Sequence, residues 1–170
     1  GERALARWFR PSGRGGAPYR LLPMYGHRSG TARQQITLLA NFVEVWLAKE
    51  GHGGPVGINL LTKVPLPNLA SLFGAMLAGV DCGLMGAGIP REIPAVLDAF
   101  AAHREARLRI DVEGGEPLQL RFDPAEHLPA GSSRRPRFLA IVSSHSLAAT
   151  LSRKSLGAVD GFVIEDPSAG

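Results

Sequence analysis

Short apolar runs alternate with helical repeats along most of the chain. Apolar runs bounded by Gly, Pro or polar residues are typical of buried strands, and they occupy residues 55–61, 80–85, 137–143 and 160–165. Apolar residues recur at helical spacing over residues 33–50, 67–79, 92–103 and 146–156. Residues 1–32 are rich in Gly, Pro and Arg, which predicts a loop and connector. The strict alternation of helix and strand predicts an α/β fold with a parallel sheet and right-handed crossovers.

One segment breaks this alternation. Residues 107–113 and 118–122 alternate polar and apolar positions, and Gly114-Gly115 lies between them. This pattern predicts a half-exposed β-hairpin over 106–122, an excursion at the edge of the sheet. Without the hairpin, about four βα units remain in a single domain over 1–170. They predict an incomplete TIM barrel of the (β/α)8 type, or a small open sheet if the chain is complete, and the pattern does not separate the two.

Composition supports the α/β interpretation. The chain has 170 residues, 45% of them hydrophobic, which is enough for one domain with a sizeable core. Its 21 Gly and 13 Pro imply many turns, which favours short alternating elements over a helical bundle.

Charge and cysteine content restrict the partners. The net charge is +4, but the arginines are scattered and form no contiguous stripe with aromatic residues, so we expect no nucleic-acid partner. No apolar run reaches the roughly 18 residues of a membrane span, so we expect no membrane partner. Cys82 is the single cysteine and has no partner for an internal disulfide, which fits a reducing, cytoplasmic location.

The two ends of the chain suggest a longer protein. The sequence begins at Gly1 without a methionine, and it ends at Gly170 in a small-residue turn that directly follows the last apolar strand. Parallel α/β proteins keep their chemistry at that end of the strands. We therefore expect this chain to be the central portion of an enzyme.

Two polar residues of the predicted strands are candidates for ligand contact. A polar side chain in a fully buried strand needs a partner, because an unpaired buried group costs about 1–3 kcal/mol. Asn59 therefore either bonds a neighbouring loop backbone or contacts a ligand at the carboxyl rim of the sheet. Glu165 ends the last strand at the same rim. Asp166 follows it directly and would point to the other face, so the two carboxylates do not form a pair.

Two turns have both a structural and a functional interpretation. Gly86-Ala87-Gly88 lies between a strand and a helix, where backbone N–H groups can approach a ligand, but it also fits a simple tight turn. Ser143-Ser144-His145-Ser146 fits a helix N-cap better than a catalytic site, because no partner for His145 is identifiable. The remaining histidines show no metal-ligand spacing, so no metal is expected.

The residues at 57–61, 77–81, 85–90 and 160–170, taken in this order, resemble the nitronate monooxygenase family, also called 2-nitropropane dioxygenase-like proteins. The resemblance covers about residues 20–170. It implies a TIM barrel that binds FMN non-covalently and oxidises alkyl nitronates with O2 to carbonyl compounds and nitrite. The alternatives are a flavin-dependent enoyl reductase, which would need a reduced nicotinamide cofactor, and a catalytically silent barrel fragment whose unpaired strand edges would allow self-association.

The resemblance also implies roles for individual residues. Asn59, Glu165 and Gly170 match positions that contact the flavin in this family, although a glutamine is more usual at the position of Glu165. The family's catalytic histidine would fall two residues past Gly170. The resemblance therefore assigns no catalytic residue to this chain, and its small-molecule substrate and O2 would meet at the flavin.

Overall fold

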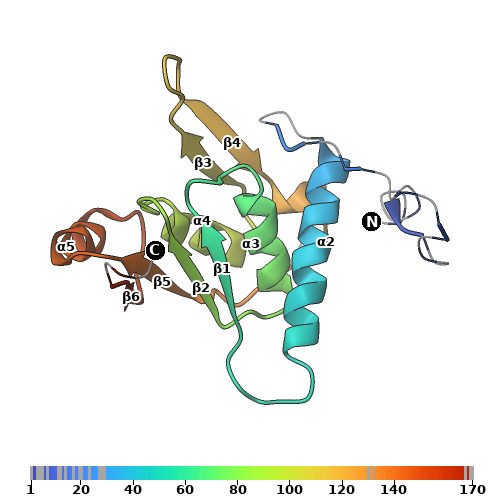
Figure 1. The fold of residues 1–170 in the computed structure, drawn as a ribbon, viewed down its shortest axis with the longest axis horizontal. Coiled ribbons are helices and arrows are strands. Elements are labelled where there is room, and N and C mark those ends of the chain that lie inside the picture. Colours follow the sequence, from blue (N-terminus) through green and yellow to red (C-terminus); the bar gives the residue numbers. More distant parts are fainter. Residues whose placement is uncertain are drawn as a thin grey trace.

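A computed structural model of the chain contains a four-stranded parallel sheet and a separate antiparallel pair (Figure 1). The structure describes residues 30–129, 131, 133–166 and 168, together with 2, 6, 8–10, 13, 15, 16, 18, 21, 22 and 24–26. The predicted α/β class with a parallel sheet is confirmed. No helix among these residues is long and apolar enough to cross a membrane.

The order of the strands in the sheet follows their order in the chain. The sheet consists of β1 (Gly57–Leu61), β2 (Cys82–Gly86), β5 (Arg137–Val142) and β6 (Gly161–Ile164), in that spatial order. A doubly wound sheet reverses its order at a switch point, but this sheet does not. Right-handed crossovers in a sheet of constant direction leave all the connecting helices on one face. Part of a barrel and an open, singly wound sheet both satisfy this topology.

The helices bury their apolar sides on that face. The core joins residues of α3 (Asn68–Leu77), α4 (Ile93–Ala101) and α5 (His145–Lys154) to the sheet side chains Met85 and Phe138. α3 is buried along almost its whole length, because α2 (Thr31–Ala48) packs against its outer side. α3 therefore forms a middle layer between the sheet and α2.

The hairpin does not lie at the edge of the sheet, so that part of the prediction was wrong. β3 (Ala106–Ile110) and β4 (Leu118–Phe122) form their own sheet and pack against α4 and α3. Its inward side chains, Leu108, Leu120 and Phe122, belong to the hydrophobic core. A sharp turn after α4, where His103 has φ 53°, directs the chain back over the helices.

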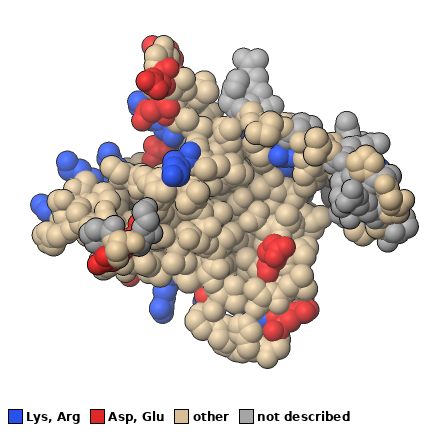
Figure 2. All heavy atoms as spheres, viewed as in Figure 1, with Lys and Arg blue, Asp and Glu red and all other residues tan. Residues whose placement is uncertain are grey.

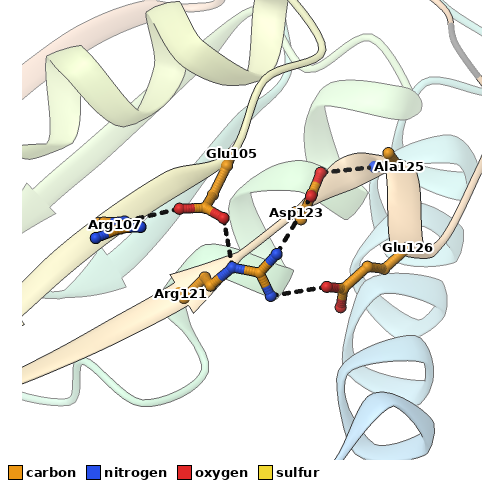
Figure 3. Close-up of polar contacts among 6 residues, drawn as sticks. All are labelled: Glu105, Arg107, Arg121, Asp123, Ala125 and Glu126. Atoms are coloured by element: carbon orange, nitrogen blue, oxygen red, sulfur yellow. Dashed lines mark hydrogen bonds and ion pairs between the residues drawn. The ribbon is translucent and has the colours of Figure 1, made fainter.

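A charged network fixes the base of the hairpin (Figure 3). Arg121 on β4 donates to Glu105, to Glu126 at 2.7 Å and to Asp123 at 3.3 Å. Arg107 donates to the other oxygen of Glu105 at 2.7 Å. Single exposed ion pairs contribute little, but one guanidinium that binds three carboxylates holds the hairpin and the 3-10 turn η1 (Pro124–Glu126) in one geometry. These carboxylates therefore bind arginines of the hairpin and have a structural role.

At the amino ends of the strands, aspartate side chains accept hydrogen bonds from the backbone of the neighbouring strand. Asp81 lies just before β2, and its Oδ2 accepts from the N–H of Val56 at 2.9 Å. Asp160 lies just before β6, and its Oδ2 accepts from the N–H of Phe138 at 2.7 Å. Each aspartate thus ties the start of its own strand to the start of the neighbouring one. In parallel barrels this rim serves stability rather than chemistry.

We expect Asp81→Asn to lower the unfolding free energy at pH 7. Hydrogen bonds from Lys49, from the N–H of Val56 and from Arg134 hold the pKa of Asp81 well below its usual range. A depressed pKa stabilises the fold fully above the unfolded pKa of about 3.9, and this contribution is lost as the pH falls through the folded pKa. Denaturant unfolding should be measured from pH 7 to pH 2. The difference in unfolding free energy between wild type and variant should decrease below about pH 4.

The control for this experiment is Glu44→Gln, which removes an exposed carboxylate from α2. It should change the unfolding free energy at pH 7 only slightly, as exposed substitutions usually do. If the difference in unfolding free energy between wild type and Asp81→Asn stays constant down to pH 2, the charge of Asp81 does not stabilise the fold.

Nearly half of the predicted connector 1–32 lies outside the described residues. Among those that are described, Glu2, Ala6 and Trp8 have helical backbone, so the prediction of a loop was wrong there. The prediction also misplaced the start of α2, which begins at Thr31 instead of residue 33.

Candidate functional site

The sheet face opposite the helices is mostly apolar, and the described residues cover it incompletely. Because the strands are parallel and in register, alternate side chains share this face. Leu84 on β2 is in register with Leu139 on β5, and Asn59 on β1 is in register with Leu84. Leu84, Leu139 and Ile141 are only half-buried and do not join the core. Since parallel sheets normally have both faces covered, this bare face, defined by Asn59, Leu84, Leu139 and Ile141, is the first candidate for a ligand.

Charge is absent from the middle of this region. Figure 2 shows a broad area over β1 and β2 without Lys, Arg, Asp or Glu, with charged side chains around it. Leu61 at the end of β1 is 45% exposed there. Such a surface favours apolar or aromatic groups over ions.

Two glycines keep the surface of the bare face flat. A Cβ at Gly86 would lie 2.8 Å from Cβ of Ile141, and a Cβ at Gly161 would lie 2.9 Å from Cδ2 of Leu139. The side chains of Ile141 and Leu139 therefore extend across the glycine positions. Glycine inside a strand often marks a site of close approach, and here it leaves a flat apolar surface.

Asn59 is exposed, so the prediction that its strand is fully buried was wrong. β1 is an edge strand, and Gly57, Asn59 and Leu61 are exposed in alternation with half-buried Ile58 and Leu60. The side chain of Asn59 makes no hydrogen bond with any described residue, so the structural alternative of a side-chain bond to a loop backbone is not observed. Its amide carries both donor and acceptor groups onto the bare face.

The other two predicted contact residues are distant from Asn59 or outside the structure. Glu165 follows β6, and its N–H donates to the carbonyl of Val142 at 2.9 Å, so it continues the strand ladder with an exposed side chain. β2 and β5 separate it from β1, which corresponds to about 14 Å across a flat sheet. Gly170 lies outside the described residues. The structure therefore does not bring Asn59 and Glu165 together.

The turn after β2 is a tight structural turn. The N–H groups of Thr62 and Lys63 donate to the carbonyls of Gly86 and Ala87 at 2.9 and 3.2 Å, so the loops after β1 and β2 continue the strand pairing. Ala87 has φ 52° and Gly88 has φ 140°. A Cβ at Gly88 would lie 3.0 Å from Cβ of Thr62, so glycine is needed for the two loops to meet.

The turn after β5 is a helix cap, as the sequence favours. The side chain of Ser144 accepts from the N–H of Leu147 at 3.3 Å and caps α5. His145 is the first residue of α5, its side chain is exposed, and it has no hydrogen-bond partner among the described residues. No group of three or more His, Cys, Asp or Glu side chains in the described part of the chain is placed to hold a metal ion.

The sequence reasoning missed a cleft away from the bare face. A cleft of about 710 Å³ lies between the loops after β1 and β2 and the end of β3. Lys63, Arg91 and Arg109 are among its lining residues. They come from three distant segments and form no motif, so only the fold reveals that they converge.

Comparisons of the chain with family models, with curated proteins and with solved structures found no match.

Proposed function

We propose that this chain contributes to the flavin site of an FMN-dependent oxidoreductase that oxidises alkyl nitronates with O2 to carbonyl compounds and nitrite. The bare face of the sheet is the observation that supports this proposal most directly. It combines a flat apolar surface with one unpartnered amide, Asn59, and the motif resemblance independently assigns a flavin contact to the same residue.

The residues of the bare face fit the ring system of a flavin. Its ring system is planar and aromatic, and Leu84, Leu139 and Ile141 offer half-buried apolar side chains against which such a ring can pack. The polar edge of the ring carries both donors and acceptors, which the amide of Asn59 can match. Glu165 would contact the flavin only if the ligand or a curved sheet spanned the distance between the two edge strands.

Bound FMN would supply the redox chemistry by accepting electrons from the nitronate. The chain's own residues would bind and orient the ring and exclude water from one side of it. None of them is assigned the proton transfer that converts a neutral nitroalkane to a nitronate. A nitronate has already lost that proton, and it is therefore the appropriate test substrate.

The first test is FMN binding to the 170-residue chain. We expect added FMN to show quenched fluorescence and a perturbed visible spectrum on titration with protein. Asn59→Leu should weaken binding about tenfold or more, since it removes the polar contact and leaves the apolar surface intact. Gln119→Leu is the matched control, because it makes the same change of an exposed amide on β4, and it should bind FMN like wild type.

Substrate tests then separate the reaction classes. Oxygen uptake and nitrite release with propyl-2-nitronate in the presence of FMN would support the proposal. Oxidation of reduced nicotinamide with an enoyl thioester, without nitrite release from nitronates, would replace it with the enoyl reductase. Absence of any spectral change on adding FMN at millimolar concentration would overturn the flavin proposal for this chain.

A further inference from the structure

The cleft between the loops after β1 and β2 and the end of β3 is separate from the bare face. Met85 and Ile93, which belong to the core on the helix side of the sheet, lie at its base. Neither Asn59 nor Leu84 lines it. Its volume of about 710 Å³ is within the range of about 300–1,000 Å³ typical of small-molecule sites.

The walls of the cleft are apolar and partly exposed. Ile89 and Leu156 both line it, and each is 55% exposed. The N–H of Leu156 donates to the carbonyl of Arg91 at 2.8 Å, which holds this residue beside the loop after β2. Two large aliphatic side chains exposed around one cavity favour a ligand with an apolar part.

Positive charge at the cleft exceeds its local compensation. Lys63 forms no ion pair or side-chain hydrogen bond with the described residues, and the guanidinium of Arg91 donates only to the carbonyl of Lys154, at 3.3 Å, among them. Arg109 is neutralised by Asp111 at 2.9 Å. Glu92 also lines the cleft and keeps its negative charge, because the backbone N–H of Arg109, from which it accepts at 2.8 Å, is neutral. Lys63, Arg91 and Arg109 thus face two carboxylates, and neither Lys63 nor Arg91 forms an ion pair with a described residue.

A buried hydroxyl points to the same conclusion. Thr62 lines the cleft, and its Oγ1 is buried without a hydrogen-bond partner among the described residues. Buried polar groups are almost always satisfied by protein, water or ligand. A ligand oxygen that reaches this hydroxyl would supply the missing bond.

We propose that this cleft binds an amphipathic carboxylate. Lys63 and Arg91 attract its anionic group, the hydroxyl of Thr62 donates a hydrogen bond to it, and its apolar chain lies against Ile89 and Leu156. This proposal is independent of the proposed flavin site, which lies on the bare face of the sheet.

Octanoate is the probe, titrated into the 170-residue chain by calorimetry and by amide NMR. We expect saturable binding, with shifts of the amide signals of Thr62 and Leu156. Lys63→Met keeps the length of the side chain and removes its charge, and it should weaken binding about tenfold. Thr62→Val should weaken it to a smaller extent. Arg104→Gln, a control before β3, should bind octanoate like wild type.

Further measurements separate this site from the alternatives. 1-Octanol has the same chain without charge, and inorganic phosphate has charge without a chain, so both should bind at least tenfold more weakly than octanoate. Asn59→Leu should leave octanoate binding intact, even if it abolishes FMN binding. If Lys63→Met does not fold, Arg91→Met replaces it. Equal binding of octanol or phosphate, no effect of either cation variant, or no octanoate binding at millimolar concentration would overturn the proposal.

Discussion

Phe122→Ala is expected to lower the unfolding free energy by about 3–5 kcal/mol, the range for truncating a buried phenylalanine. Phe122, Phe73 and Phe100 are each no more than 1% exposed. Their ring centroids lie 5.2–5.5 Å apart, in tilted or edge-on pairs. The three rings come from β4, α3 and α4, so the truncation leaves a cavity where the hairpin meets both helices. Such aromatic pairs also contribute beyond the area that they bury.

Equilibrium unfolding in urea measures this loss, and amide exchange locates it. We expect the amides of β3 and β4 to lose protection before those of β2 and β5, because the hairpin depends on this contact. Phe122→Leu should cost clearly less, since an apolar side chain of similar size refills most of the space. Leu118→Ala is the control on the same strand, because Leu118 is 36% exposed, and it should change stability only slightly. Equal effects of Phe122→Ala and Leu118→Ala would contradict the packing described above.

Gly74→Ala is expected to destabilise the protein by up to about 3 kcal/mol, although alanine favours helices. A Cβ on Gly74 would meet the backbone of Leu38 on α2, at 2.9 Å from its carbonyl carbon and 3.0 Å from its Cα. A backbone cannot rotate away as a side chain can. The substitution therefore forces α2 away from α3, and the strain exceeds the gain in helix propensity of about 1 kcal/mol.

Gly83→Ala is the matched control, because a Cβ there meets no atom within 4 Å. It should change the unfolding free energy by less than about 1 kcal/mol. The two variants are compared by their midpoints of urea unfolding, provided that the slope of free energy against urea concentration is the same for both. A Gly74→Ala variant as stable as wild type would show that α2 packs less closely on α3 than the structure has it.

The candidate site divides into a part that the sequence predicted and a part that it did not. Asn59 was identified because an amide interrupts an apolar run, and on the bare face its side chain has no hydrogen-bond partner among the described residues. Its burial was predicted wrongly, because an edge strand and a central strand of a parallel sheet have the same apolar pattern. The separation of Glu165 from Asn59 depends on how many strands lie between them, which local sequence does not encode.

The hairpin illustrates the same limit. Alternation over 107–113 and 118–122 predicted both strands and their turn, because side chains of a half-buried strand point to opposite faces. To predict the position of the hairpin, one must know which part of the protein its apolar face packs against. That partner proved to be α3 and α4, through Phe122, rather than the edge of the parallel sheet.

The sequence by itself determined most of the helices and strands of this protein and their order. Helical and strand periodicities act over a few residues, and the cap at Ser144 and the turn at Gly114-Gly115 are equally local. Only the tertiary structure decided which sheet face stays bare, that β1 is an edge, and that Lys63 and Arg91 meet at one cleft. These features depend on strand order and on contacts between distant segments, and no pattern within a short window of sequence specifies them.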